Sequence, residues 1–359
     1  MAKITIKKDR SGTGLQIDLQ DDLDLLVGKG VAVERTDDGA VAFGYGNGHT
    51  AIIHGKLIGS QGIALGNERA VDNDETVIVG KTGRIDGVDV GINVAAWGSE
   101  IINAGKVRAE FGVFLGGISA DTTTRITNSG TIYGNQAAIY VDSSTTEDIQ
   151  FINTGNVLGS IGYYATDATV NRDVIINKGY FQFSIYLGGG DDVYNGAKGQ
   201  LSKAAAVTGL SGDDILRGGK KYDNLYGGDG DDRLTGGGAG DQLSGESGAD
   251  VLTGGAGKDK FIYHELDDST PEAPDLIDFK TGDSFFIEIN DFEDDVEEID
   301  FVFIGKDAFS GTEGEIRFEI GTEFTTVYGD FDGNSIADFV VNVKGSHKFV
   351  DDDFSIGIG

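Results

Sequence analysis

An aspartate recurs at every ninth position through the middle of the chain, and this period constrains the fold more than any other feature. The series is Asp214, Asp223, Asp232, Asp241, Asp250 and Asp259, followed two residues later by Leu216, Leu225, Leu234, Leu243, Leu252 and Phe261 respectively. Residues 227–235 and 254–262 match the pattern G-G-x-G-x-D-x-U-x, where U is a large apolar residue, at every specified position. A flexible linker would not keep this register, so the series predicts stacked short strands joined by tight turns.

The residue types in this repeat suit a hard cation. Glycines let the backbone turn tightly and aim carbonyl oxygens at one point, and aspartates add anionic oxygens. Ca²⁺ takes six to eight oxygens, so two turns stacked one coil apart would complete a shell, which predicts about five or six ions. The predicted metal ligands are Asp192, Gly212, Asp214, Asp223, Gly228, Gly230, Asp232, Gly237, Asp241, Gly248, Asp250, Gly255, Gly257 and Asp259.

Asp192 belongs to this set because residues 187–194, Leu-Gly-Gly-Gly-Asp-Asp-Val-Tyr, contain the same glycine–aspartate turn. It precedes Asp214 by 22 residues, which is close to one coil of a second, longer period. We therefore expect one solenoid to run through both repeats, with Asp192 and Asp214 sharing a calcium ion.

The longer period lies upstream and is marked by asparagine. Asn103, Asn128, Asn153 and Asn177 each follow a short apolar run and precede a glycine by two residues. Each unit of about 24 residues reads as three short strands separated by turns, which is typical of a right-handed parallel β-helix. Asparagines in register on successive coils predict a structural amide ladder rather than a ligand site.

Composition excludes several classes of partner and site. The net charge of −32 makes nucleic acid and anionic membrane surfaces poor partners. The chain has no cysteine, which excludes disulfides and thiolate metal sites. No apolar run reaches the length of a membrane span, and the N-terminus has no apolar signal-peptide core, so an export signal is expected elsewhere.

The nonapeptides resemble the repeats-in-toxin calcium β-roll, and the sequence after them resembles the C-terminal domain of the serralysin metalloproteases. The resemblance covers about residues 209–359 and rests on segments 254–261, 275–283, 303–311, 329–339 and 351–356. It implies folding outside the cell on calcium and a C-terminal signal for type I secretion machinery. Lys221 stands where the repeat has glycine, which puts the ion nearest Asp223 in doubt, and Ala239 and Glu246 are milder departures.

Two further groups of oxygen-bearing side chains lie beyond the repeats. Asp275, Asp278 and Asp283 are candidate ligands at the end of the roll. Asp330, Asp332, Asn334 and Asp338 have the order of a calcium loop. Asp-Gly-Asn is also good hairpin-turn chemistry, so both interpretations of this second group stay open.

Catalytic motifs are sparse. His264-Glu265 is not followed by the second histidine of H-E-x-x-H, so a serralysin-type protease site is not encoded, and the G-x-S-x-G motif is absent too. A β-helix can carry a polysaccharide lyase, epimerase or hydrolase site, and Arg84 and Lys106 are expected to stack on successive coils. Neither a paired carboxylate motif nor an aromatic stripe emerges from the sequence, so an enzyme remains the alternative.

The sequence thus predicts an all-β chain: a right-handed parallel β-helix continuing into a calcium-binding parallel β-roll, with a mixed β C-terminal cap. The expected domains are an N-terminal cap (1–49), the β-helix (50–190), the roll (188–262) and the serralysin-like domain with its secretion signal (263–359). The expected role is structural or interactive, in an extracellular matrix, surface layer or adhesion system. Expected partners are calcium, a cell-surface polysaccharide and further copies of the chain.

Overall fold

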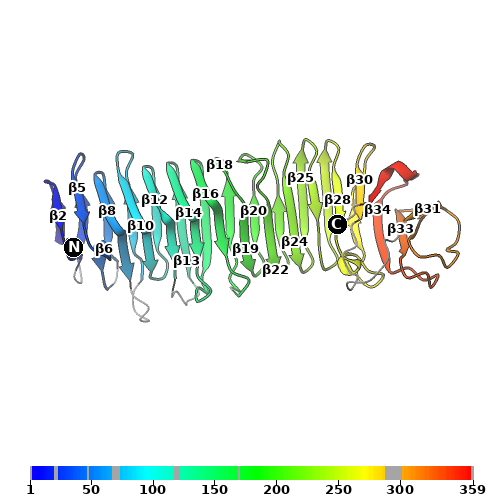
Figure 1. The fold of residues 1–359 in the computed structure, drawn as a ribbon, viewed down its shortest axis with the longest axis horizontal. Helices are drawn as coiled ribbons and strands as arrows, with labels where there is room; N and C mark the ends of the chain where they lie inside the picture. The colour runs from blue at the N-terminus through cyan, green and yellow to red at the C-terminus, as the bar shows by residue number, and fades with distance from the viewer. Residues whose placement is uncertain are drawn as a thin grey trace. The chain divides into compact units, whose positions relative to one another are not determined.

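The computed structural model describes residues 2–19, 23–46, 48–66, 73–116, 122–168, 170–287 and 301–356. These residues belong to two compact units, Met1–Ala206 and Val207–Gly359 (Figure 1). Strands make up nearly all of the regular structure, and the helices among the described residues are two short 3-10 turns, Leu266–Asp268 and Asp351–Asp353. None of the described helices is long and apolar enough to cross a bilayer.

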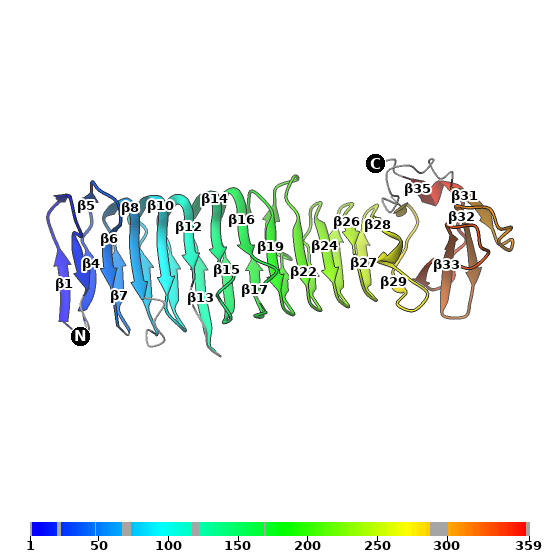
Figure 2. The same cartoon turned by 60° about the horizontal axis from the view of Figure 1, so that its bottom comes forward.

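The first unit is a parallel solenoid, and one of its sheets takes a short strand from each coil. These strands are β1 (Ala2–Ile6), β4 (Leu23–Val27), β7 (Thr50–Ile53), β9 (Thr76–Val79), β11 (Glu100–Asn103), β13 (Thr123–Asn128), β15 (Asp148–Asn153), β17 (Val174–Asn177) and β20 (Val193–Asn195). Each one pairs in parallel with the next in this order (Figure 2).

The second sheet of this unit carries the remainder of each coil. Its strands are β2 (Arg10–Gly12), β3 (Ile17–Leu19), β5 (Ala32–Arg35), β6 (Ala40–Gly44), β8 (Lys56–Gly66), β10 (Arg84–Ala95), β12 (Lys106–Leu115), β14 (Thr131–Val141), β16 (Asn156–Ala165), β18 (Tyr180–Phe181), β19 (Ile185–Gly189) and β21 (Gln200–Leu201). β5 pairs with the start of β8 and β6 with its end. The second and third strands of the predicted coil are therefore merged, in the middle coils, into one long strand with a register irregularity near its centre.

Residues 2–44, within the segment expected to be an N-terminal cap, form β1 to β6 and pair in parallel as the later coils do. Alternating burial along each short strand builds the core of the unit. Val77, Ile101, Ile126, Phe151 and Ile175 occupy one register position on successive coils, and all are fully buried. The period of two in these sequences therefore points one apolar side chain per coil inward.

The second unit begins with a flatter parallel roll. Its strands are β22 (Val207–Ser211), β23 (Ile215–Arg217), β24 (Asn224–Asp229), β25 (Arg233–Gly238), β26 (Gln242–Ser244), β27 (Val251–Ala256) and β28 (Lys260–Tyr263). Each strand pairs in parallel with the next but one, 18 residues further on, as in Ile215 with Arg233. Every apolar residue of the nonapeptide series, from Leu216 to Phe261, is buried in the thin core.

A mixed sheet follows the roll. β29 (Asp275–Ile277) and β30 (Ser284–Ile287) extend the two sheets of the roll in parallel. β31 (Val302–Gly305) pairs in parallel with β32 (Glu315–Ile320), whereas β32, β33 (Phe324–Asp330) and β34 (Phe339–Lys344) form an antiparallel meander. β34 pairs with β29 and β35 (Phe354–Ile356) with β30, both in parallel. The predicted all-β fold of β-helix, β-roll and mixed β cap is confirmed.

An aromatic column that did not emerge from the sequence runs along the β-helix. Phe114, Tyr140, Tyr164 and Tyr186 lie at matching positions on β12, β14, β16 and β19 and are all half-buried. Their ring centroids follow one another at 5.2, 5.6 and 5.9 Å. The sequence hides this aromatic column because its members are 22 to 26 residues apart, and only the coil register brings them together.

The predicted asparagine ladder is present and runs over four successive coils. The Nδ2 of Asn103 donates to the Oδ1 of Asn128 at 2.8 Å, Asn128 donates in the same way to Asn153, and Asn153 to Asn177. Each Oδ1 also accepts from the backbone N–H of the glycine two residues later, as Asn128 does from Gly130. An amide has both donors and acceptors, so these buried side chains satisfy one another without any ion.

We predict that Asn128→Ala lowers the free energy of unfolding by about 3 kcal/mol, because it removes the buried hydrogen bonds of Asn128 with both adjoining rungs and with the N–H of Gly130. Urea denaturation in excess calcium measures the change. Asn156→Ala, at an exposed position at the start of β16, is the matched control and should change stability by less than about 0.5 kcal/mol. Equal losses in the two variants would show that the ladder contributes nothing of its own.

Candidate metal centre

The nine-residue aspartates form two ladders, because each coil of the roll contains two turns. In one ladder the backbone N–H of Asp214 donates to the Oδ1 of Asp232 at 2.7 Å, and Asp232 donates to Asp250 at 2.8 Å. In the other ladder Asp223 donates to Asp241 and Asp241 to Asp259, both at 2.9 Å. Every one of these aspartates is at most 5% exposed. The nonapeptide register thus places buried carboxylates one above another along each row of turns.

The second carboxylate oxygen of these aspartates is left for another partner. The Oδ2 atoms of Asp232, Asp241, Asp250 and Asp259 are buried and accept no hydrogen bond from any described residue. Each lies over the first glycine of its own turn. A Cβ added at Gly227 would lie 2.0 Å from the Oδ2 of Asp232, and the corresponding distances in the other three turns are 2.4, 2.0 and 2.3 Å. The glycine therefore keeps open the space into which an acceptor-only oxygen points.

The other glycines of the turn are required by backbone conformation and by stacking. The predicted site glycines all have left-handed φ angles: Gly212 (120°), Gly228 (121°), Gly230 (130°), Gly237 (111°), Gly248 (148°), Gly255 (101°) and Gly257 (148°). A Cβ on Gly230 would also lie 2.4 Å from the carbonyl oxygen of Gly212, one coil earlier. Side chains at these positions would separate the stacked turns.

Residues that depart from the repeat change the backbone strain or the hydrogen bonding of their turn. Ala239 and Glu246, which replace glycine, keep left-handed φ angles of 79° and 67°, a conformation that costs a residue with a Cβ about 1 kcal/mol or more. The turn containing Lys221 differs more. There the Oδ2 of Asp223 accepts a hydrogen bond from the N–H of Gly219 at 2.6 Å, so this carboxylate already has a protein partner.

The ladders end on aspartates that follow the nonapeptide run. The N–H of Asp250 donates to Asp275 at 2.9 Å, and the N–H of Asp259 donates to Asp283 at 3.0 Å. Asp275 and Asp283 therefore extend the two ladders by one rung each. Asp278 lies outside the ladders: its Oδ1 accepts from the N–H of Gly254, and its Oδ2 pairs with Lys280 at 2.9 Å.

A similar aspartate of the first unit, Asp173, was not predicted from the sequence. The N–H of Asp173 donates to the Oδ1 of Asp192 at 2.6 Å, in the manner of the roll ladders. Asp173 precedes Asp192 by 19 residues, one more than the coil of the roll, which is why the nine-residue period does not reveal it. Its own carboxylate accepts from the hydroxyl of Tyr163 and from the N–H of Ile149. Because Asp192 and Asp214 belong to different units, their shared ion stays a prediction.

The geometry of the C-terminal loop fits both a calcium site and a hairpin turn. Carboxylate oxygens of Asp330, Asp332 and Asp338 lie within 4.8 Å of one another, as a cation would need. The same groups also brace the turn, since Asp330 accepts from the N–H groups of Asn334 and Ser335. The Oδ1 of Asn334 accepts from the N–H of Ile336.

Burial makes ionised ladder carboxylates costly when no cation is bound. Burial, together with smaller contributions from neighbouring acidic groups, raises the pKa of Asp232 to about 9 and that of Asp250 to about 7. Burial likewise raises the pKa of Asp241 to about 7, with smaller contributions from Asp223 and Asp259. The ladder carboxylates are closely stacked and can only accept, and Ca²⁺ prefers hard oxygen ligands of this kind. A bound Ca²⁺ would also neutralise their charge.

The family model Peptidase M10 serralysin C terminal matches residues 162–356. This range is more than half of the 359 residues. The chain belongs to the serralysin C-terminal family. No curated protein matches the chain.

The serralysin C-terminal match reaches further upstream than the resemblance seen in the sequence, and it includes Asp173 and Asp192 as well as both ladders. Repeats-in-toxin rolls of this family bind calcium and belong to secreted proteins, so the chain fits a calcium-binding repeat protein. Within the first unit the match covers residues 162–206 alone. The sequence contains no H-E-x-x-H motif.

The raised pKa values predict how the stability of the roll changes with pH when a chelator keeps it free of calcium. A carboxyl group with a higher pKa in the folded than in the unfolded chain binds its proton more tightly when folded. The stability contributed by Asp232, Asp241 and Asp250 should be fully present below about pH 4 and lost as the pH rises through about 7 to 9. Circular dichroism in EGTA should therefore show β structure decreasing with rising pH.

Two comparisons isolate this effect. In excess Ca²⁺ the trend should reverse at low pH, because protons compete with the cation for the same oxygens. A variant with asparagine at all three positions should lose most of the dependence in EGTA while keeping the general effect of net charge. β structure that increases with pH in EGTA would contradict the prediction.

Proposed function

We propose that the chain is a secreted calcium-binding structural or interaction protein of an extracellular matrix, surface layer or adhesion system, and that it folds on extracellular Ca²⁺. The observation that carries the proposal is the row of buried Oδ2 atoms without a hydrogen-bond donor among the described residues. A buried carboxylate without a partner costs several kcal/mol, and both ladders repeat this arrangement coil after coil. A bound cation is the simplest group that offsets so many costs at once.

The folding mechanism follows from charge. At low calcium the acidic repeats repel one another, since the chain carries a net charge of −32. Bound Ca²⁺ neutralises the carboxylates, and its binding free energy becomes folding free energy. The proposed ligands are the ladder aspartates together with the backbone of the glycine turns, which hold about five or six ions at six to eight oxygens each. Asp275 and Asp283 are proposed as terminal ligands of the ladders.

This coupling suits export through type I secretion machinery. A chain that stays unfolded where calcium is scarce can pass through a secretion channel, and it then folds where calcium is plentiful. Family membership supports an extracellular location. The part of the molecule that would act after export is the first unit, whose regular coils give a long surface for a partner.

The alternative function is a polysaccharide-modifying enzyme with its site on the β-helix. The observation that favours it is a groove on the first unit lined by Arg84, Asp86 and Arg108. Asp86 is held by two cations there, Arg84 and Lys56. Turnover of acidic polysaccharides by the calcium-loaded chain tests this alternative.

Self-association is a further part of the proposal. Among the described residues β1 pairs with β4 alone, so one side of its backbone has no strand partner there. Strand edges of this kind favour end-to-end stacking.

We predict that Asp232→Asn raises the Ca²⁺ concentration at the midpoint of folding by about tenfold, since losing one charged ligand costs on the order of 1.4 kcal/mol. Circular dichroism during a calcium titration measures the midpoint. Asp229→Asn removes the same charge from an exposed position three residues away and should shift the midpoint by less than about twofold. Identical spectra of the unaltered chain in EGTA and in millimolar Ca²⁺ would refute calcium-coupled folding.

We predict that self-association appears as light scattering that rises with Ca²⁺ and with protein concentration. Pro substitution at Thr5, whose backbone N–H lies on the side of β1 away from β4, should abolish the increase, because proline has no N–H to donate to an added strand. Calcium-saturated chain that stays monodisperse and monomeric would refute self-association without affecting the proposal on folding.

A further inference from the structure

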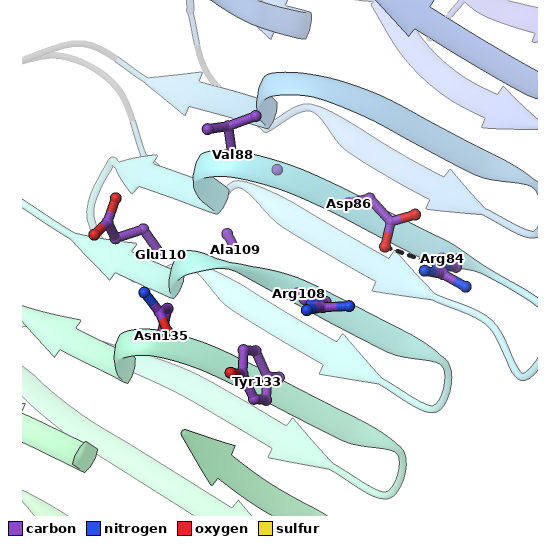
Figure 3. A pocket seen from close by; sticks show the side chains of 9 residues that line it. Arg84, Asp86, Val88, Arg108, Ala109, Glu110, Tyr133 and Asn135 are labelled. Carbon is purple, nitrogen blue, oxygen red and sulfur yellow. Dashed lines mark hydrogen bonds and ion pairs between the residues drawn. The ribbon is translucent and has the colours of Figure 1, made fainter. Parts of the chain in front are cut away.

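The outer surface of the β-helix carries a groove that the calcium repeats do not explain. Two adjoining pockets of about 490 and 410 Å³ lie over β10, β12 and β14 and share Arg84, Asp86, Arg108 and Tyr133 as lining residues. Figure 3 shows these four side chains on neighbouring coils, with Glu110 and Asn135 further along the same strands. Volumes of this size are typical of ligand sites.

The groove concentrates positive charge in a strongly acidic chain. The strand register places Lys56, Arg84 and Lys106 opposite one another on successive coils. Like charges in direct opposition destabilise a sheet, so the row needs counter-charges, which Asp86 supplies for Lys56 and Arg84 and no described residue supplies for Lys106. In a chain of net charge −32, three adjacent cations are expected to have a function that offsets their cost.

Only part of this positive charge is neutralised within the protein. Asp86 forms ion pairs with Arg84 at 2.7 Å and with Lys56 at 2.9 Å. Lys106 and Arg108 are exposed and form no ion pair with any residue that the structure describes. The guanidinium of Arg108 lies 5.2 Å from the centroid of the Tyr133 ring, which restrains its position. Two cations are thus presented to solvent, one of them held in place by an aromatic ring.

We propose that this groove binds an acidic polysaccharide, with sugar carboxylates paired to Arg108 and Lys106. Arginine is well suited to planar, bidentate contact with carboxylate. Successive coils are separated by the strand spacing of about 4.8 Å, so a linear polymer lying along the solenoid would pass Arg84, Lys106 and Thr131 in turn. This inference deepens the interaction role proposed above by naming the ligand class.

The acidic and amide groups in the groove favour a glycan over a nucleic acid. Asp86 and Glu110 line the same pocket as the cations, and Asn135 lies beside them. Such acceptors suit the many hydroxyl groups of sugars, and these are far fewer on a nucleic acid.

The test is isothermal titration calorimetry of the full, calcium-loaded chain with a galacturonic acid oligosaccharide. Arg108→Gln and Lys106→Gln should each weaken binding about tenfold, as expected for the loss of one charge-assisted contact. Arg125→Gln is the matched control, since Arg125 is an exposed arginine of β13 in the same unit and lines neither pocket. It should change the affinity by less than about twofold. Neutral dextran should not bind.

Several outcomes would overturn the proposal: no binding by the unaltered chain, equal loss in Arg108→Gln and Arg125→Gln, or tighter binding of an oligothymidylate than of the uronate. Cleavage or epimerisation of the polymer that disappears in the groove variants would support the site and assign it to the enzymatic alternative. Circular dichroism of each variant in Ca²⁺ separates this test from calcium-coupled folding, because the roll folds or fails to fold independently of the sugar.

Discussion

The hydrogen bond from the backbone N–H of one aspartate to the carboxylate of the aspartate one coil later is the interaction on which the second unit depends. It fixes the register of the coils, because Asp214 meets Asp232 only when the turns are stacked in phase. It also uses one carboxylate oxygen and leaves the other buried. The same contact that aligns the roll thereby creates its need for a cation.

The two units solve one structural problem with different side chains. Stacked turns bury a row of polar side chains in each unit, and these side chains must be satisfied. The amides of Asn103 and Asn128 donate to and accept from their neighbours, so the ladder of the first unit needs no ligand. Aspartate can only accept, so the ladders of the roll need a group from outside. The choice of Asn or Asp at a turn therefore separates a ladder that satisfies itself from one whose carboxylates fit a bound cation.

Tyr163 and Asp173 show where these two solutions meet within the first unit. The carboxylate of Asp173 is satisfied by the hydroxyl of Tyr163 and by backbone N–H, although its own N–H donates to Asp192 in the manner of the roll. Burial raises the pKa of Asp173 to about 8, as it raises those of the ladder aspartates. Asp173 differs from them in its hydrogen bonds, because both of its carboxylate oxygens accept one from the protein. The family match begins at residue 162, at this same place in the chain.

The sequence by itself determined the solenoid, its two periods and the row of aspartates, because each follows from residue spacing along the chain. It also indicated Asp275 and Asp283, although not that they complete the ladders. Only the tertiary structure decided which oxygen of each carboxylate stays open, that Asp173 joins Asp192, and that Tyr140 and Tyr164 form a column. The groove of Arg84 and Arg108 belongs to this second group. These features depend on contacts between coils whose lengths vary by a few residues, and such contacts have no fixed spacing in the sequence.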